Sequence, residues 1–126
     1  LWYNAVSYTL AVAKKQGDKA FVAEWKDMPE RTKDSFIKKF WLDEEGYLAD
    51  YVNHDEVNKF IRCNMVVACG LDYRMLNDEQ LVNTLQTVRQ HLLTPRGLRT
   101  LSPRNLSDRC DQILAGKCVQ RLESAE

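Results

Sequence analysis

The stretch NDEQLVNTLQTVRQHLL, residues 77–93, carries the clearest helical pattern in the chain. Its apolar residues recur at intervals of three and four, which places four of them on one face of an α-helix: Leu81, Leu85, Val88 and Leu92. Asn77 is a favourable N-cap, and the two acidic residues after it suit the first helical turn. The stretch therefore predicts an amphipathic helix that packs one face against a helical neighbour.

The same periodicity predicts helices over residues 1–16, 30–42 and 61–71. The first two have clear apolar faces, made by Tyr3, Val6, Leu10 and Ala13, and by Phe36, Ile37, Phe40 and Trp41. Residues 61–71 are almost entirely apolar, which predicts burial on several sides. A turn is expected at Gly17 and a weaker helix over residues 108–122. The expected fold class is all-α, built from antiparallel helical hairpins.

Two connections between the predicted helices are long, at residues 43–60 and 94–107. In an up-and-down arrangement both lie at the same end of the molecule, beside the start of the first helix. Long ordered connections in compact domains are commonly functional. We therefore expect a concave working end with Arg62 and Asn64 at its floor.

A faint internal repeat supports an array of hairpins. LWYNAV at residues 1–6 aligns with IRCNMV at residues 61–66, which places Asn4 over Asn64. If alternate helices are equivalent, these two asparagines would lie around one central pocket.

Length and charge exclude some partners. With 126 residues, the chain suits one domain or a part of a larger one. Lys and Arg number 18, and Asp and Glu also number 18, whereas a nucleic-acid partner usually requires a basic excess. The longest uncharged apolar stretch, residues 63–71, is too short to cross a membrane. We expect neither nucleic acid nor a membrane as a partner.

The cysteines and histidines show no ligand spacing. The four cysteines form no CxxC pair, and His54 and His91 lie far apart in the sequence. Neither a metal site nor a cofactor is therefore expected. Free buried thiols suit a reducing compartment, so the expected location is the cytoplasm.

Polar side chains at the head of an apolar helix need an explanation, and Arg62 and Asn64 form such a pair. They either satisfy carbonyl groups of nearby loops or hydrogen-bond a polyhydroxylated ligand, and both roles stay open. Tyr47, Tyr51 and Trp2 offer flat faces for sugar rings, although core packing is commoner for any single aromatic residue.

Charged residues in the two long connections are further candidates. Asp50 lies between apolar residues in YLADYV, which makes it the best internal carboxylate for an inward role. Glu44 and Glu45, beside Gly46, suit a solvent-exposed turn. Arg99 belongs to a locally basic segment, where arginines bind phosphate or, more commonly, brace neighbouring loops.

Three segments together are similar to a known family: LWYNA at residues 1–5, the Arg-x-Asn of residues 62–64, and LLTPRGLRTLSP at residues 92–103. They resemble the C-terminal domain of glycogen debranching enzymes, which carries amylo-α-1,6-glucosidase activity in an (α/α)6 toroid of helical hairpins. The resemblance covers about residues 1–105 and leaves residues 106–126 as a divergent C-terminal segment. It implies that the chain begins inside a helix of that domain and holds about two of its hairpins.

The resemblance implies glycogen or a related branched α-glucan as substrate, and hydrolysis of its α-1,6 bonds by an inverting pair of carboxyl groups. It places the acid upstream of residue 1 and the base far downstream, so the chain alone is expected to contain no catalytic residue and to be inactive. Five residues are expected to position the substrate: Asn4, Asp50, Arg62, Asn64 and Arg99. Cys63 and Met65 depart from the Pro and Gln of the family, and residues 106–126 lack its Arg-Asp-x-Ala-Tyr-His-x-Gly segment.

Two other functions stay open. One is a non-catalytic helical-repeat module that binds another protein. The other is an enzyme complete within these residues, in which Asp50 pairs with Asp55 or Glu56. Apolar faces left uncovered on helices 1–16 and 61–71 predict self-association, or else coverage by apolar side chains of the last segment: Leu106, Ile113, Leu114, Val119 and Leu122.

Overall fold

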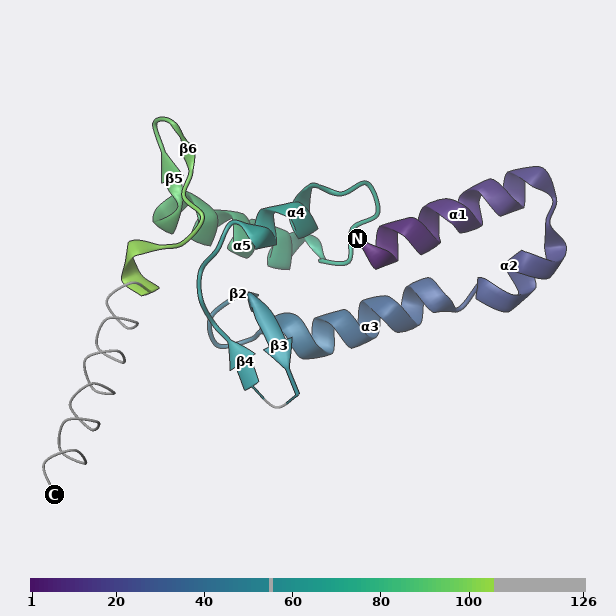
Figure 1. Cartoon of the computed structure of the whole chain (residues 1–126), viewed down its shortest axis with the longest axis horizontal. Helices are drawn as coiled ribbons and strands as arrows, with labels where there is room; N and C mark the ends of the chain where they lie inside the picture. The colour runs from purple at the N-terminus through teal and green to yellow at the C-terminus, as the bar shows by residue number, and fades with distance from the viewer. Residues whose placement is uncertain (55, 106–126) are drawn as a thin grey trace, which may run out of the picture.

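The computed structural model describes residues 1–54 and 56–105. Figure 1 shows an elongated molecule with a helical arm and a second part that carries the short strands. The arm consists of α1 (Trp2–Gln16), α2 (Lys19–Trp25) and α3 (Met28–Phe40), and the second part contains α4 (Asn64–Gly70) and α5 (Asp78–His91). The chain runs outward along α1, turns through α2 and returns along α3, which packs beside α1. The helix expected over residues 108–122 lies outside the described residues, as does the segment 106–126.

Three antiparallel pairs of short strands lie in the connections, and the periodicity did not predict them. They are β1 (Trp41–Leu42) with β2 (Tyr47–Leu48), β3 (Tyr51–Asn53) with β4 (Glu56–Asn58), and β5 (Leu93–Thr94) with β6 (Gly97–Leu98). Strands of two or three residues are too short to show a period of two in the sequence. The all-α prediction was therefore right that helices dominate and wrong in omitting these strands: the described part is helix-rich with short antiparallel strands.

Helix α1 confirms the first predicted helix and its apolar face. Val6, Leu10 and Ala13 are buried, and Tyr3 is half-buried. The helix ends at Gly17, whose φ of 73° is left-handed and favours glycine. Backbone N–H groups in this turn bond the carbonyls of Ala13 and Lys14, so the last helical turn is closed as in many helix ends.

Helix α2 was not predicted, because only seven residues form it. Asp18 begins it by accepting a 3.0 Å hydrogen bond from the backbone N–H of Phe21. The rings of Phe21 and Trp25 are stacked with centroids 5.6 Å apart, and Trp25 meets Trp2 of α1 edge-on at 6.3 Å. A helix this short is marginal alone, and the contact of Trp25 with Trp2 holds it against α1.

Helix α3 begins two residues before the predicted start and ends two residues early. Pro29 lies in its first turn, where the missing N–H costs nothing. The helix stops at Phe40 because Trp41 and Leu42 pair with β2 instead. The predicted apolar face packs against the core, with Phe36 and Phe40 stacked at 4.9 Å.

Helix α5 confirms the clearest sequence pattern. Asn77 accepts a 2.8 Å hydrogen bond from the N–H of Gln80, and the Gln80 side chain accepts a 3.1 Å bond from the N–H of Asn77, which forms a capping box. Val88 and Leu92 of the predicted seam are buried, but Leu85 is 43% exposed. The buried face is rotated toward Thr84.

Helix α4 is shorter than the predicted helix over residues 61–71. It begins at Asn64, because Arg62 forms an antiparallel bridge with Leu101 and the preceding chain is extended. Met65 is buried as expected, but Val67 is 53% exposed. The prediction that this helix is buried on several sides was therefore wrong for its outer face. The self-association expected from such faces stays a prediction.

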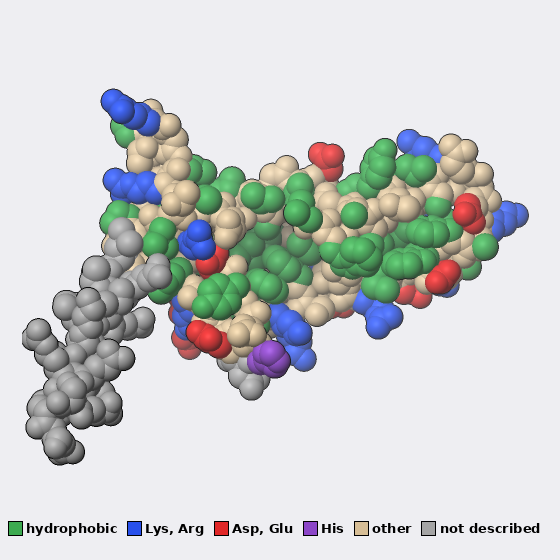
Figure 2. Space-filling view, viewed as in Figure 1, with side chains coloured by type: hydrophobic (Ala, Val, Ile, Leu, Met, Phe, Trp, Pro, Cys, Tyr) green, Lys and Arg blue, Asp and Glu red, His purple; other side chains and the backbone are tan. Residues whose placement is uncertain are grey.

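The main core lies where β2, α4 and α5 meet the end of α3. It consists of buried Leu48, Ile61, Met65, Leu76, Val88 and Leu92. A second apolar contact runs along the arm, where Figure 2 shows hydrophobic side chains gathered between α1 and α3. None of the helices in the described part of the chain is both long and apolar enough to cross a bilayer.

Candidate functional site

A hollow of ≈ 570 Å³ lies where the two long connections meet. The first connection lines it with Asp50, Tyr51, Glu56, Asn58 and Phe60, and the opposite wall is made by Arg62, Thr100 and Leu101. The lining thus combines carboxylates, an amide, a hydroxyl and a guanidinium with two aromatic rings. This combination of donors, acceptors and flat apolar faces suits a polyhydroxylated ligand.

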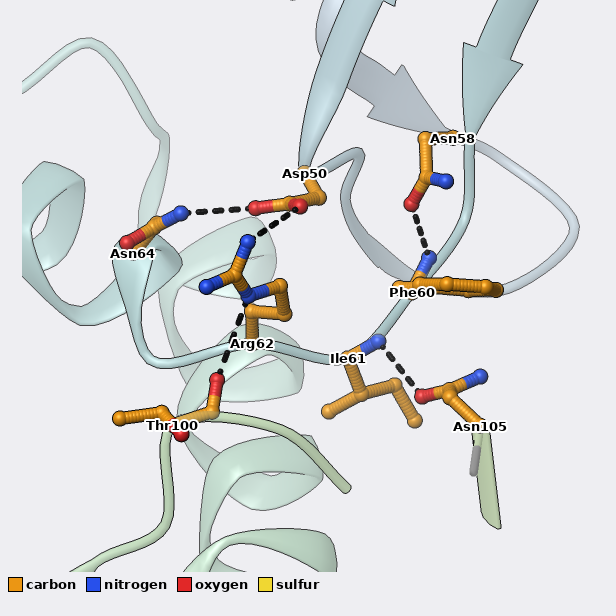
Figure 3. Close-up of polar contacts among 8 residues, drawn as sticks. All are labelled: Asp50, Asn58, Phe60, Ile61, Arg62, Asn64, Thr100 and Asn105. Atoms are coloured by element: carbon orange, nitrogen blue, oxygen red, sulfur yellow. Dashed lines mark hydrogen bonds and ion pairs between the residues drawn. The ribbon is translucent and has the colours of Figure 1, made fainter. Parts of the chain in front are cut away.

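Asp50 is the centre of the polar contacts at this hollow. Figure 3 shows its carboxylate between two side chains: Oδ1 accepts a 2.7 Å hydrogen bond from Nδ2 of Asn64, and Oδ2 accepts a 3.3 Å bond from Nη1 of Arg62. The Asp50 side chain is only 4% exposed. Its backbone N–H donates to the carbonyl of Asn58 at 2.9 Å. The carboxylate is therefore fixed both by its own backbone and by two donors.

Arg62 joins the two connections. Its Nε donates to the carbonyl of Thr100 at 3.4 Å while Nη1 pairs with Asp50. The Arg62 side chain is 43% exposed, and it lines the hollow. A guanidinium has five N–H donors, of which these contacts use two within the described part of the chain. The remaining donors are available to a ligand in the hollow.

The structure does not bring the other two expected residues to this place. Both polar groups of the Asn4 amide bond the backbone of Tyr73, in the connection between α4 and α5. Arg99 is exposed, and its backbone N–H bonds the carbonyl of Leu92 beside the β5–β6 hairpin. The alignment of Asn4 with Asn64 therefore does not correspond to one shared pocket. Asp50, Arg62 and Asn64 are the members of the expected set that meet.

Four lining residues were not identified from the sequence: Asn58, Phe60, Thr100 and Leu101. A local signal exists for Asn58, because its side chain accepts a 3.0 Å bond from the N–H of Phe60 two residues later, as asparagines in turns commonly do. Thr100 and Leu101 lie in the quoted segment LLTPRGLRTLSP, but a sequence does not show which of its residues reach the opposite wall.

A second set of contacts braces the same connection. The hydroxyl of Tyr47 donates to the carbonyl of Lys59 at 2.9 Å, and the Lys59 ammonium pairs with Glu45. Burial, and next the negative charge of Glu45, raise the pKa of Tyr47. The hydrogen bond with Glu45 raises the pKa of Lys59. Tyr47 therefore holds the chain here, and Glu45, expected in a solvent-exposed turn, is half-buried and paired.

Metal and thiol chemistry depend on how the His, Cys, Asp and Glu side chains of residues 1–54 and 56–105 are arranged. No group of three or more His, Cys, Asp or Glu residues in the described ranges is arranged to hold a metal ion. Cys63 and Cys69 are free and half-buried, and burial raises the pKa of the Cys69 thiol. A thiol with a raised pKa is a weak nucleophile at neutral pH.

Comparison with family models matches residues 1–111 to the amylo-alpha-1,6-glucosidase family. The chain belongs to this family. The match includes every residue that lines the hollow, and it confirms the resemblance inferred from the three quoted segments. No curated protein and no solved structure matches the chain significantly.

Membership in this family indicates a glycosidase domain of the glycogen-debranching type, with a glucan as the general class of substrate. Of the two departures from the family motif, Met65 is 5% exposed and belongs to the core cluster. It is not among the residues that line the hollow, so this departure leaves the lining unchanged.

Proposed function

We propose that the hollow binds glucose units of a branched α-glucan and that the chain positions this substrate for an amylo-α-1,6-glucosidase domain. The observation that carries the proposal is the Asp50 carboxylate, held by Arg62 and Asn64 in the wall between the two connections. Family membership supplies the class of substrate. The mixed polar and aromatic lining of the hollow supports the proposal that this substrate binds there.

The hollow offers the two kinds of contact that a sugar requires. Free N–H groups of Arg62 donate to sugar hydroxyls, and the contacts with Asp50 and Thr100 orient the guanidinium toward the hollow. The ring of Tyr51, which is 46% exposed, presents an apolar surface to the C–H groups of a pyranose. Groups that are fixed before binding contribute to rate by orienting the substrate.

Asp50 acts as a positioning residue in this proposal, not as a catalytic one. A general acid must carry a proton and release it to the leaving oxygen. The Asp50 side chain is instead 4% exposed, and both of its oxygens already accept a hydrogen bond, one from Asn64 and one from Arg62. Glu56 lines the same hollow but is exposed, and Asp55 lies outside the described residues.

The architecture and the location belong to the same proposal. We place helices α1 to α5 in part of an (α/α)6 toroid. In that arrangement, neighbouring hairpins cover apolar side chains that are half exposed here, such as Val67, Val82 and Leu85. The free half-buried thiols of Cys63 and Cys69 suit the cytoplasm.

Electrophoresis in native gels that contain glycogen tests the proposal. The wild-type chain is expected to be retarded by glycogen and not by dextran. Tyr51→Ala is expected to weaken binding about fivefold, the equivalent of about 1 kcal/mol for one stacking ring. Tyr8→Ala is the matched control, because Tyr8 is an exposed tyrosine on α1 outside the hollow. Equal mobility with and without glycogen would contradict the proposal and favour a non-catalytic interaction module.

A further inference from the structure

The segment 100–105 holds the backbone of Ile61 from both sides. The N–H of Ser102 donates to the carbonyl of Ile61 at 2.9 Å, and the N–H of Ile61 donates to the Asn105 side-chain oxygen at 2.9 Å, as Figure 3 shows for the second bond. One short segment therefore satisfies both polar groups of the residue that precedes Arg62. The Arg62–Leu101 bridge continues the same contact.

These bonds lie where water is excluded. Ile61 is 3% exposed, Ser102 1% and Asn105 7%. Asn105 is itself oriented by its backbone N–H, which donates to the carbonyl of Ser102 at 3.1 Å. A buried N–H that loses its acceptor has no water to replace it, so the Ile61 N–H depends on the Asn105 side chain.

The next residue is sensitive to the position of Ile61. The contacts of the Arg62 guanidinium with Asp50 and Thr100 are 3.3 and 3.4 Å long, near the outer end of hydrogen-bond distances. Because both contacts are already long, a shift of residue 61 that carries the guanidinium outward by a few tenths of an ångström takes them beyond hydrogen-bond distance. The direction of the Arg62 donors therefore depends on a group that does not line the hollow.

We infer that Asn105 is a positioning residue for the glucan site, acting on Arg62 through the backbone of Ile61. The inference rests on the proposed function for its effect on glucan binding, but the effect on Arg62 is independent of it. The sequence gives no sign of this role, because 44 residues separate Asn105 from Ile61.

Three variants of the full chain test the inference. Asn105→Ala removes the acceptor, Asn105→Asp keeps an acceptor at the same place, and Asn83→Ala is the control, a half-buried asparagine on α5 that does not line the hollow. If Asn105→Ala does not fold, Asn105→Leu fills a similar volume and also lacks the acceptor. The first readout is amide hydrogen exchange of Ile61 relative to that of Leu92, whose N–H bonds the carbonyl of Val88 in α5. This ratio separates a local release from a global loss of stability.

The second and third readouts are the nitrogen NMR signal of Arg62 Nε and the affinity for branched limit dextrin. In Asn105→Ala, relative exchange of Ile61 is expected to rise at least about tenfold, the Arg62 signal to move, and affinity to fall about tenfold. Asn105→Asp should recover all three to within about threefold of the wild type. If the Ile61 amide in Asn105→Ala exchanges at the wild-type relative rate, or if the Arg62 signal does not move, the inference is overturned. If the Arg62 signal moves but the wild-type chain binds no limit dextrin, the proposed function fails and the positioning of Arg62 by Asn105 stands.

Discussion

Asn4 and Tyr73 exchange two hydrogen bonds although 69 residues separate them. Nδ2 of Asn4 donates to the carbonyl of Tyr73 at 2.8 Å, and the N–H of Tyr73 donates to Oδ1 of Asn4 at 3.0 Å. The pair ties α1 to the connection between α4 and α5. It gives Asn4 a structural contact, while the substrate contact expected from the sequence stays a prediction.

Replacement of Asn4 by alanine is therefore expected to destabilise the fold without weakening the glucan site. The free energy of unfolding should fall by about 1–3 kcal/mol, because two partly buried backbone groups of Tyr73 lose their partner. Urea denaturation measures this change. Asn53→Ala, at an exposed position, should remain within about 0.5 kcal/mol of the wild type. Wild-type stability combined with weaker glucan binding in Asn4→Ala would return Asn4 to the substrate site.

The capping box of α5 gives a second prediction. Asn77→Ala leaves the N–H of Gln80 without its acceptor and should cost about 1 kcal/mol of stability. Gln80→Ala removes the longer of the two bonds of the capping box, and it should lower the free energy of unfolding by less than Asn77→Ala does. Gln86→Ala, at an exposed position of the same helix, should be neutral or slightly stabilising because alanine is the better helix former. Thermal or urea unfolding that ranks Asn77→Ala with Gln86→Ala would show that the cap contributes little.

These two cases show what the sequence can and cannot establish. The N-cap at Asn77 was predicted because N-caps obey a local positional rule, although the reciprocal bond from Gln80 was not named. The partner of Asn4 was not predicted, because residue type at a helix start does not say which distant backbone it reaches. The same limit applies to the strands, whose two or three residues pair only after the flanking helices have packed.

The candidate site was also predicted only in part: its residues were identified, but the contacts between them were not. Asp50, Arg62 and Asn64 were each identified by their local setting, a carboxylate between apolar residues and two polar groups at the head of an apolar helix. The sequence did not show that one carboxylate accepts from both of the others, and it gave no sign of Asn105. Contacts between segments depend on how the two connections fold, and each connection contains short strands that local patterns do not reveal.

The departure from the family motif at Cys63 is open to direct test. Cys63 has a φ of −63°, which proline adopts without strain, and its N–H bond to Thr100 is 3.4 Å long and therefore weak. The extended conformation that proline imposes on the preceding residue suits Arg62, which is bridged to Leu101. Cys63→Pro should therefore change the free energy of unfolding by no more than about 1 kcal/mol in either direction.

Ala68→Pro provides the contrast for that measurement. It places proline inside α4, removes a helical hydrogen bond and should cost about 3 kcal/mol or more. Equally large losses of unfolding free energy in Cys63→Pro and Ala68→Pro would mean that the N–H or the side chain of Cys63 holds the segment 100–105 more strongly than the distances indicate.

Stability at alkaline pH should depend on Glu45. The pKa of Lys59 is raised from 10.5 by its hydrogen bond with Glu45, and the pKa of Tyr47 is raised from 10.0 by burial and next by the same carboxylate. Both groups hold their protons more tightly in the folded chain than in the unfolded chain. The stability that these two groups contribute to the folded chain is therefore complete below about pH 10. It is lost as the pH rises through their raised pKa values.

Glu45→Gln is expected to reduce this pH dependence. Urea denaturation at about pH 8 and at about pH 11 should show a smaller difference in unfolding free energy for Glu45→Gln than for the wild type. Glu44→Gln is the matched control, since Glu44 is exposed and is only a minor cause of the Lys59 shift. If the unfolding free energy falls equally in the wild type and in Glu45→Gln at alkaline pH, groups other than Lys59 and Tyr47 cause the alkaline loss of stability.

The chain alone should release no glucose from a branched limit dextrin. Within the described ranges, Asp50 is tied to Arg62 and Asn64, and Glu56 is the other carboxylate that lines the hollow. An enzymatic glucose assay on purified wild-type chain should therefore equal the buffer blank. Release that disappears in Asp50→Asn would instead make Asp50 a catalytic residue of a complete enzyme.

The most direct test of the central claim is a nitrogen-15 NMR titration of the wild-type chain with a branched maltooligosaccharide. If the hollow is the glucan site, the signals that move should be the amides of Asp50, Tyr51 and Thr100 and the Nε of Arg62, and they should saturate together. Signals of Tyr8 and of the aromatic pair Phe21 and Trp25 on the helical arm should stay in place. Unmoved signals throughout, or movement confined to the arm, would contradict the assignment of this hollow as the glucan site.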